Sequence, residues 1–156
     1  MAVKLVKAEI ADAEQIWQMQ IEAFKDLLKT YQDYNLSPGN EAFEKVRRRF
    51  LMPETHFYFI EDDGVKVGAI RVVDPSPTTG GKRISPIFIM KEHRGKGYAQ
   101  KAIIEAEKLH GNDNWSLDTI LEEKGNCYLY EKMGYHKTGK LWKVNKKMTI
   151  VYYEKQ

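Results

Sequence analysis

The chain has 156 residues, a length typical of one ordinary domain, so we expect a single domain over residues 1–156. Hydrophobic residues make up 42% and aromatic residues 12% of the chain, enough to fill a core, which argues against disorder. The 25 basic and 22 acidic residues give a net charge of +3. This mild excess is not the composition of a dedicated nucleic-acid-binding protein.

The sequence also argues against a membrane or secreted location. No apolar stretch approaches the roughly 20 residues that a membrane-spanning helix needs. Residues 1–7 lack the long apolar run of a signal peptide. Cys127 is the single cysteine, which excludes an internal disulfide and a zinc site made of several cysteines. We therefore expect a cytoplasmic protein without membrane or nucleic-acid partners.

The first elements in chain order are a short strand and a long helix. Residues 3–7 alternate in polarity and predict a strand. Asp12 is a favourable N-cap for the helix, and Gln15 follows it at the spacing of a capping box. The predicted helix ends before the helix-breaking segment 35–39. Its apolar side chains recur at helical spacing and are Trp17, Ile21, Phe24 and Leu28.

A second helix and a β-hairpin follow. We predict the helix over residues 41–51. Its apolar side chains are Phe43, Val46 and Phe50. Residues 56–61 and 65–73 are rich in β-branched and aromatic residues, which favours strands. The Asp62-Asp63-Gly64 segment between them is typical of a hairpin turn.

A glycine-rich, basic turn stands between a predicted strand and a predicted helix in the second half of the chain. The apolar residues 84–90 predict the strand, and residues 101–109 predict the helix, which ends at Gly111. Between them lies Arg94-Gly95-Lys96-Gly97-Tyr98-Ala99. Backbone N–H groups and the positive end of the helix dipole would converge here, which favours an anion such as a phosphate.

The last part of the chain completes a mixed pattern. Residues 114–119 predict a short strand, and residues 126–133 predict a helix. Residues 135–144 and 147–153 predict a closing antiparallel pair of strands. The order is therefore strand, two helices, three strands, helix, strand, helix and two strands, which indicates an α+β fold.

Two common nucleotide-binding motifs do not fit the glycine turn. A Rossmann fingerprint has a third glycine and lies near the first strand, and a Walker loop continues as Gly-Lys-Ser/Thr. The turn instead matches Arg/Gln-x-x-Gly-x-Gly/Ala, which resembles the acetyl-CoA-binding signature of the GNAT superfamily of N-acetyltransferases. Residues 129–135, Leu-Tyr-Glu-Lys-Met-Gly-Tyr, are similar to the Leu-Tyr-Glu-Lys-x-Gly-Phe motif found downstream in that family.

The resemblance covers nearly the whole chain and implies a fold and an activity. The implied fold is the α+β GNAT fold, a mixed, mostly antiparallel twisted sheet of about seven strands flanked by about four helices. The implied activity is direct transfer of acetyl from acetyl-CoA, the cosubstrate, to a primary amine of a small molecule or peptide, without a metal. The resemblance leaves open whether the chain forms a homodimer.

Coenzyme A is implied to lie along the strand 84–90 and the glycine turn. The pyrophosphate would approach Gly95 and Gly97, which have no Cβ, while the pantetheine arm would bond to the strand backbone. The residues implied to bind acetyl-CoA are Ile87, Phe88, Ile89, Arg94, Gly95, Lys96, Gly97, Tyr98, Ala99, Gln100 and Asn126. For Asn126, capping of its own helix is the alternative.

Tyr130 is the catalytic residue that the resemblance implies, as the acid that protonates the departing thiolate. A phenol with a pKa of about 10 is protonated at neutral pH and can donate. The acceptor must lose a proton, because a lysine-like amine is neutral in roughly one molecule in 2,500 at pH 7. The strand 84–90 holds no carboxylate or histidine. The candidates for the base are therefore Glu22, Glu61, Asp74, Asp118 and a chain of waters.

The missing carboxylate keeps a second function open. A GNAT-fold protein that binds acyl-CoA without efficient turnover would act as a sensor or a structural partner. The sequence does not identify the acceptor amine.

Overall fold

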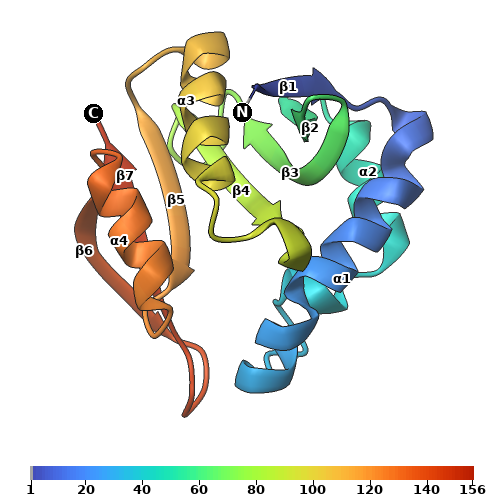
Figure 1. Cartoon of the computed structure of the whole chain (residues 1–156). Coiled ribbons are helices and arrows are strands. Elements are labelled where there is room, and N and C mark those ends of the chain that lie inside the picture. The colour runs from blue at the N-terminus through green and yellow to red at the C-terminus, as the bar shows by residue number, and fades with distance from the viewer. Residues whose placement is uncertain (1) are drawn as a thin grey trace.

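Seven strands form one sheet in the computed structural model, which describes residues 2–156 (Figure 1). Their order across the sheet is β1-β2-β3-β4-β5-β7-β6. Neighbouring strands run antiparallel except β4 and β5, which are parallel. The strands are β1 Val3–Lys7, β2 Thr55–Asp62, β3 Val65–Val73, β4 Lys82–Ile89, β5 Trp115–Ile120, β6 His136–Lys143 and β7 Thr149–Lys155. The expected mixed, mostly antiparallel α+β fold is thereby confirmed.

Within residues 2–156, four α-helices cover the two faces of the sheet (Figure 1). They are α1 Ala13–Tyr31, α2 Phe43–Phe50, α3 Tyr98–His110 and α4 Lys124–Lys132. Short 3-10 turns precede the first three of them, at Ile10–Asp12, Pro38–Asn40 and Lys91–His93. In this described part of the chain, no helix is long and apolar enough to cross a membrane.

Alternation along the strands divides the hydrophobic residues between two cores. In β2, Phe57 and Phe59 face α1 and α2, where they join a cluster with the fully buried Val46. Tyr58 and Ile60 point to the opposite face and join a cluster with α3 and α4. The buried residues that seat α3 on this face are Ala102, Ile103 and Ala106. Two apolar layers therefore hold helices against both sides of the sheet.

The sheet divides between β4 and β5. These two strands pair only at their beginnings, where Lys82 lies beside Trp115 and Arg83 lies beside Ser116. Beyond that point they diverge, and the separation is visible in the middle of Figure 1. The chain thus forms two halves, one built on β1 to β4 and one on β5 to β7, with an opening between them.

The predicted N-cap of α1 is confirmed in its position but not in its capping bond, and the predicted start of α3 is wrong. Asp12 stands at the N-cap position of α1 but makes no capping bond to it. Its carboxylate instead accepts the N–H of Glu9 at 2.9 Å, which closes the preceding 3-10 turn. The helix predicted from residue 101 starts earlier, at Tyr98, directly after the left-handed Gly97. The last residues of the glycine motif are therefore the first turn of α3.

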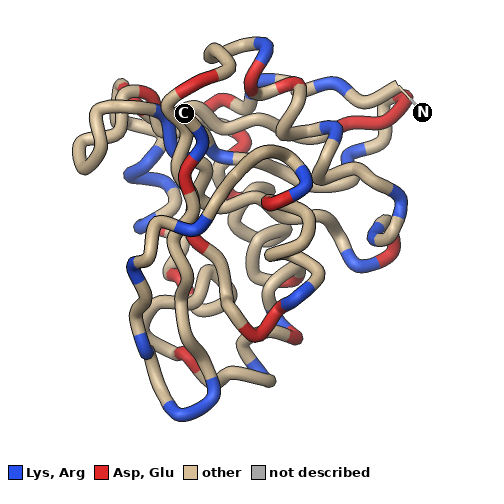
Figure 2. Tube along the Cα trace, turned by 90° about the vertical axis from the view of Figure 1, so that its left-hand side faces the viewer, with Lys and Arg blue, Asp and Glu red and all other residues tan. Residues whose placement is uncertain are grey.

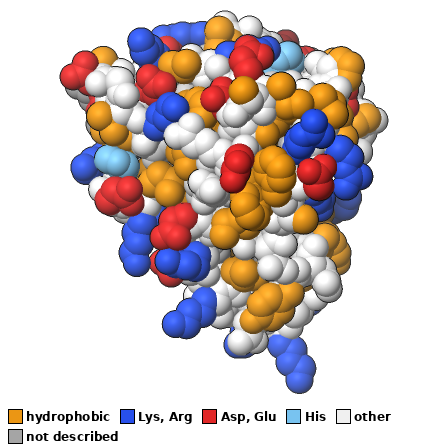
Figure 3. Space-filling model, turned by 90° about the vertical axis from the view of Figure 1, so that its right-hand side faces the viewer, with side chains coloured by type: hydrophobic (Ala, Val, Ile, Leu, Met, Phe, Trp, Pro, Cys, Tyr) orange, Lys and Arg blue, Asp and Glu red, His pale blue; other side chains and the backbone are white. Residues whose placement is uncertain are grey.

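Two faces of the molecule differ in the side chains that they expose. Lysines follow β6 and the turn after it (Figure 2). They are Lys137, Lys140, Lys143, Lys146 and Lys147. All eight residues of β6 are exposed, so this edge strand is open to solvent. The face covered by α1 and α2 instead mixes hydrophobic and charged side chains (Figure 3).

Candidate active site

The glycine turn is exposed to solvent and leads directly into the first turn of α3. Gly95 and Gly97 have φ angles of 77° and 82°, a region that favours glycine. A Cβ built on either residue would meet no atom within 4 Å. An anion can therefore approach the backbone N–H groups and the positive end of the α3 dipole without steric hindrance.

The charged and aromatic residues of the turn have different surroundings. Arg94 donates from Nε to the Ile89 carbonyl at 2.9 Å and from Nη2 to the Ala23 carbonyl at 2.7 Å. Its guanidinium thus ties the turn to β4 and α1. Lys96 is exposed, whereas Tyr98 is buried and donates its hydroxyl to Asp62 at 2.5 Å. Arg94 is exposed as well, but its guanidinium is bonded to these two carbonyls, so Lys96 is the cation of the turn that extends into solvent beside the glycines.

The first turn of α3 continues the motif. Ala99 and Gln100 are half-buried and follow Tyr98 directly. Ala99 is small, so the helix presents little side-chain bulk close to Gly97. The sequence-predicted phosphate residues therefore occupy one continuous surface, from the turn to the start of α3.

β4 presents an unpaired backbone edge to the opening. Ile87, Phe88 and Ile89 pair with β3 on one side only. The Phe88 carbonyl points to β3, where a Cβ on Gly68 would lie 2.1 Å from its oxygen. Because successive residues in a strand direct their N–H and C=O groups to opposite edges, those of Ile87 and Ile89 face the opening, where the Ile89 carbonyl already accepts the Nε–H of Arg94. An extended chain of amides can bond to such an edge.

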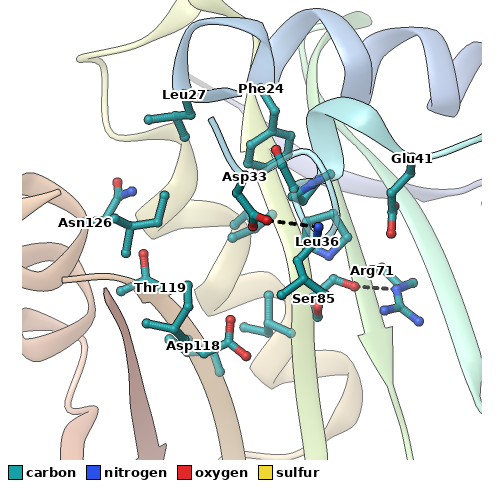
Figure 4. A pocket seen from close by; sticks show the side chains of 18 of the residues that line it. Phe24, Leu27, Asp33, Leu36, Glu41, Arg71, Ser85, Asp118, Thr119 and Asn126 are labelled. Atoms are coloured by element: carbon teal, nitrogen blue, oxygen red, sulfur yellow. Dashed lines mark hydrogen bonds between the residues drawn. The ribbon is translucent and has the colours of Figure 1, made fainter. Parts of the chain in front are cut away.

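A pocket of about 350 Å³ lies where β4 and β5 separate (Figure 4). Residues 84–87 of β4 and residues 117–120 of β5 form opposite walls. Phe24 and Leu27 of α1 close a third side, and the last two strands contribute Trp142 and Tyr152. The volume is at the lower end of the range of roughly 300 to 1,000 Å³ that small-molecule sites span.

Tyr130 lines this pocket from α4 and is held firmly in place. Its ring is buried and packs against Tyr135 and Tyr153, with centroid separations of 6.3 and 6.2 Å. Burial, with smaller contributions from Asp118 and Cys127, raises the pKa of Tyr130 above its ordinary value. The phenol is therefore protonated at neutral pH and available as a proton donor.

Asn126 also lines the pocket, and it does not cap its helix. The N-cap of α4 is Glu123, whose carbonyl accepts the N–H of Asn126 at 3.1 Å. Asn126 lies in the first turn, and its side chain is exposed on the α4 side of the pocket (Figure 4). The capping alternative is thus ruled out by the position at which the helix begins.

Among the four candidate carboxylates for the base, Asp118 is the one that lines the pocket. It bonds to Arg83 across the β4–β5 junction at 2.7 Å. Glu22 is exposed on α1 and pairs with Lys25, while Asp74 bonds to the ring of His110. Neither these two nor Glu61 lies on the pocket wall.

Six further charged residues of the pocket were not predicted from the sequence. They are Asp33, Glu41, Lys45, Arg49, Arg71 and Arg83. Glu41 accepts both Nη atoms of Arg49, at 2.8 and 2.7 Å, and the amide of Gln20 at 2.7 Å. Burial raises the pKa of Glu41, but the bonds from Arg49 and Gln20 outweigh it and lower the pKa below its ordinary value.

Local sequence signals for these residues exist but are weak. Glu41, Lys45 and Arg49 are spaced four residues apart, the spacing of ion pairs along a helix. Arg71 is a charged residue within the otherwise mostly apolar strand 65–73, and arginine is rarely buried unless it has a partner. Neither signal indicates that these side chains meet β4 and β5 at one pocket.

Comparison with known proteins agrees with this geometry. Residues 14–135 match the model of the acetyltransferase (GNAT) family. A Mus musculus protein named "Probable N-acetyltransferase family 8 member 5" is 26% identical over 117 residues. That match covers 70% of this chain and 51% of the mouse protein, so the chain spans about half the length of that curated relative.

Solved structures of the same fold include two from Vibrio cholerae. The crystal structure of its spermidine N-acetyltransferase in complex with CoA and spermine has a TM-score of 0.75 at 18% identity, and covers 97% of this chain and 93% of that one. A dodecameric structure of spermidine N-acetyltransferase from the same organism has a TM-score of 0.72 at 17% identity, covering 99% and 94%. At these identities the likeness shows the shared fold.

Proposed function

Because the chain belongs to the GNAT family of acetyltransferases, we propose that it transfers acetyl from acetyl-CoA directly to a primary amine of a small molecule or peptide. One observation carries the proposal: the open edge of β4 runs from the glycine turn to the pocket that Tyr130 lines. An anion-binding turn at one end and a proton donor at the other suit a phosphate-bearing thioester laid along the strand.

In this proposal coenzyme A follows β4. The pyrophosphate lies against the N–H groups from Gly95 to Gln100, with Lys96 supplying positive charge from solvent. The pantetheine amides bond to the backbone of Ile87 and Ile89, and Phe88 supports this strand from the α1 side. Asn126 reaches the arm from α4. Arg94 acts here by holding β4 and α1 against the turn.

The proposed chemistry joins the amine nitrogen to the acetyl carbonyl carbon and breaks the carbon–sulfur bond. The thiolate that leaves takes a proton from the Tyr130 hydroxyl, and the phenolate regains one of the two protons that the acceptor gives up, the other going to solvent. The ammonium form of the acceptor loses one proton before attack and one after it. Asp118, or water ordered near it, is the base that we propose, because it lies on the pocket wall.

An acceptor screen with thiol release as the readout tests the activity. We expect thiol release from acetyl-CoA that depends on an amine, with the acetylated amine identified by mass spectrometry. Retained acetyl-CoA binding with no transfer to any amine would contradict the proposal. That result would support the alternative of an acyl-CoA-binding protein without efficient turnover, which the pairing of Asp118 with Arg83 favours.

Assembly and location are part of the same proposal. The Vibrio cholerae relative forms a dodecamer, and the edge strand β6 of this chain is exposed and carries Leu141 and Trp142. We propose a homodimer of a cytoplasmic enzyme. Light scattering after size exclusion gives the mass that tests the homodimer, and a value of 18.2 kDa would contradict it.

A further inference from the structure

Arg71 is a half-buried cation on the pocket wall that has no acidic partner. It lies in β3 and points to the side of the sheet that α1 and α2 cover. Its Nε donates to the carbonyl oxygen of Ser85 on the neighbouring β4 (Figure 4). Within residues 2–156, no carboxylate lies within 4.0 Å of its guanidinium.

Two carboxylates of the pocket wall, Glu41 and Asp118, are already bonded to other cations, and Glu54, the other acid that acts on Arg71, forms no ion pair with it. Glu41 is held by both Nη atoms of Arg49 and by Lys45 at 3.3 Å. Asp118 is held by Arg83 at 2.7 Å. Arg71 is therefore the guanidinium of this pocket whose two Nη groups are left for a ligand.

The surroundings of Arg71 make an unpaired state costly. Burial, followed by the positive charge of Arg49, lowers the pKa of Arg71 to about 9; Arg83 adds to this effect, and the negative charges of Glu41 and Glu54 offset only part of it. Burying a charge is unfavourable unless an opposite charge or hydrogen bonds compensate for it. A ligand that brings a negative charge to the two Nη groups would supply that compensation.

We propose that Arg71 binds a carboxylate of the acceptor, so that the acceptor is an amine that also carries a carboxylate, such as a free amino acid. This inference rests on the proposed acetyl transfer and narrows its substrate class. The planar guanidinium presents paired N–H groups that match the two oxygens of a carboxylate. The same buried cation disfavours a polyamine, which brings only positive charges.

Two carboxylates of the pocket suit the amine end of such an acceptor. Asp33 is buried at the start of the loop after α1, and its Oδ1 accepts the N–H of Leu36 at 3.1 Å. Asp118 lies on β5 across the opening. Figure 4 shows Asp33 and Asp118 on the pocket wall, and neither of them lies next to Arg71. A zwitterion can therefore meet an arginine and carboxylates within one pocket.

Acceptors that differ only at the carboxylate measure how much this group contributes to recognition. The probes are L-leucine, L-methionine and L-phenylalanine, each with its amide and its decarboxylated amine, and spermidine. With the wild type, we expect kcat/KM for the acid to exceed that for its amide by at least about tenfold for one side chain or more. In Arg71→Gln this ratio should fall close to one, mainly through a higher KM for the acid.

Two further variants control for folding and for charge. Arg71→Lys keeps the positive charge and lacks the planar fork, so it should restore part of the ratio. Arg47→Gln removes an exposed arginine of α2 that does not line the pocket and should leave the ratio unchanged. A wild-type preference for spermidine or for decarboxylated amines, or an unchanged ratio in Arg71→Gln, would overturn the inference.

A binding measurement distinguishes this inference from the proposed activity. Calorimetric titration of the CoA-loaded protein with the same acids needs no turnover. Binding that weakens at least tenfold in Arg71→Gln supports carboxylate recognition, even if no amine is acetylated. Efficient acetylation of decarboxylated amines, with no Arg71-dependent binding of acids, would retain the transferase and reject the carboxylate site.

Discussion

At the scale of single residues, the glycines of the turn would let the proposed coenzyme A approach the backbone closely. Gly97→Glu should abolish measurable acetyl-CoA binding, because it adds a side chain and a negative charge where the phosphates are proposed to lie. Gly64→Glu is the matched control. Gly64 has the same φ of 82° and equally open surroundings, but it lies in the β2–β3 turn. Isothermal titration with acetyl-CoA checks this, and equal affinity in both variants would reject the site.

Tyr130 offers a second prediction at this scale. Tyr130→Phe should lower kcat by about 100-fold, the range typical for a lost general acid, and leave the Kd for acetyl-CoA nearly unchanged. The ring packing against Tyr135 and Tyr153 is kept, so the fold should persist. Tyr128→Phe, on the exposed side of the same helix, is the control. An unaffected kcat in Tyr130→Phe would place the acid at another residue.

Glu41 acts at the scale of elements, because it joins the segments that enclose one side of the pocket. Its carboxylate bonds to Gln20 of α1 and Arg49 of α2, and its carbonyl accepts the indole N–H of Trp17 at 2.8 Å. Glu41→Gln should lower the free energy of unfolding at pH 7 by about 2 kcal/mol, since hydrogen bonds to charged groups contribute about that much.

The same contacts predict a pH dependence. The folded-state pKa of Glu41 lies below its ordinary value of 4.5, so the folded state binds fewer protons than the unfolded chain. The contribution of Glu41 is therefore present above about pH 4.5 and is lost as the pH falls through the folded-state pKa. Urea unfolding from pH 7 to pH 3 should show a weaker acid-side decline in Glu41→Gln than in Glu44→Gln, an exposed control. Parallel curves would contradict this.

The division of the sheet governs behaviour at the scale of the whole molecule. Besides the short β4–β5 pairing, the halves are linked where Tyr31 donates to Glu123 at 2.5 Å and where Asn145 donates to the Tyr31 carbonyl at 2.9 Å. A ligand bound in the opening would contact both halves. Coenzyme A should therefore slow amide hydrogen exchange in β5 and α4 as well as in the glycine turn.

Ligand linkage gives this prediction a magnitude. At a concentration of 100 times its Kd, coenzyme A should raise the free energy of unfolding by about 2.7 kcal/mol. Mass spectrometry of exchanged peptides locates the protection, and Gly97→Glu should show neither effect. Protection confined to residues 94–100 would mean that the ligand does not reach the opening between the halves.

The order of elements could be predicted because it depends on local patterns. Alternation in β2, helical spacing in α3 and the glycines after β4 act within a few residues of each other. The predicted start of α3 at residue 101 is three residues late, because the left-handed Gly97 lets the helix begin at Tyr98 and this conformation is not visible in the sequence pattern. Asp12 is the N-cap of α1 as predicted, but its carboxylate bonds backward to Glu9 and does not cap the helix, which the local pattern does not reveal.

By itself the sequence determined the succession of strands and helices and the glycine turn with its downstream tyrosine motif, because both depend on neighbouring residues. Only the tertiary structure decided which charges share the pocket. Arg71 and Asp118 are far apart in the chain, and their partners depend on how β3, β4 and β5 are placed. The proposed preference for a carboxylate follows from that placement, since it takes the whole fold to leave one buried guanidinium without an acid.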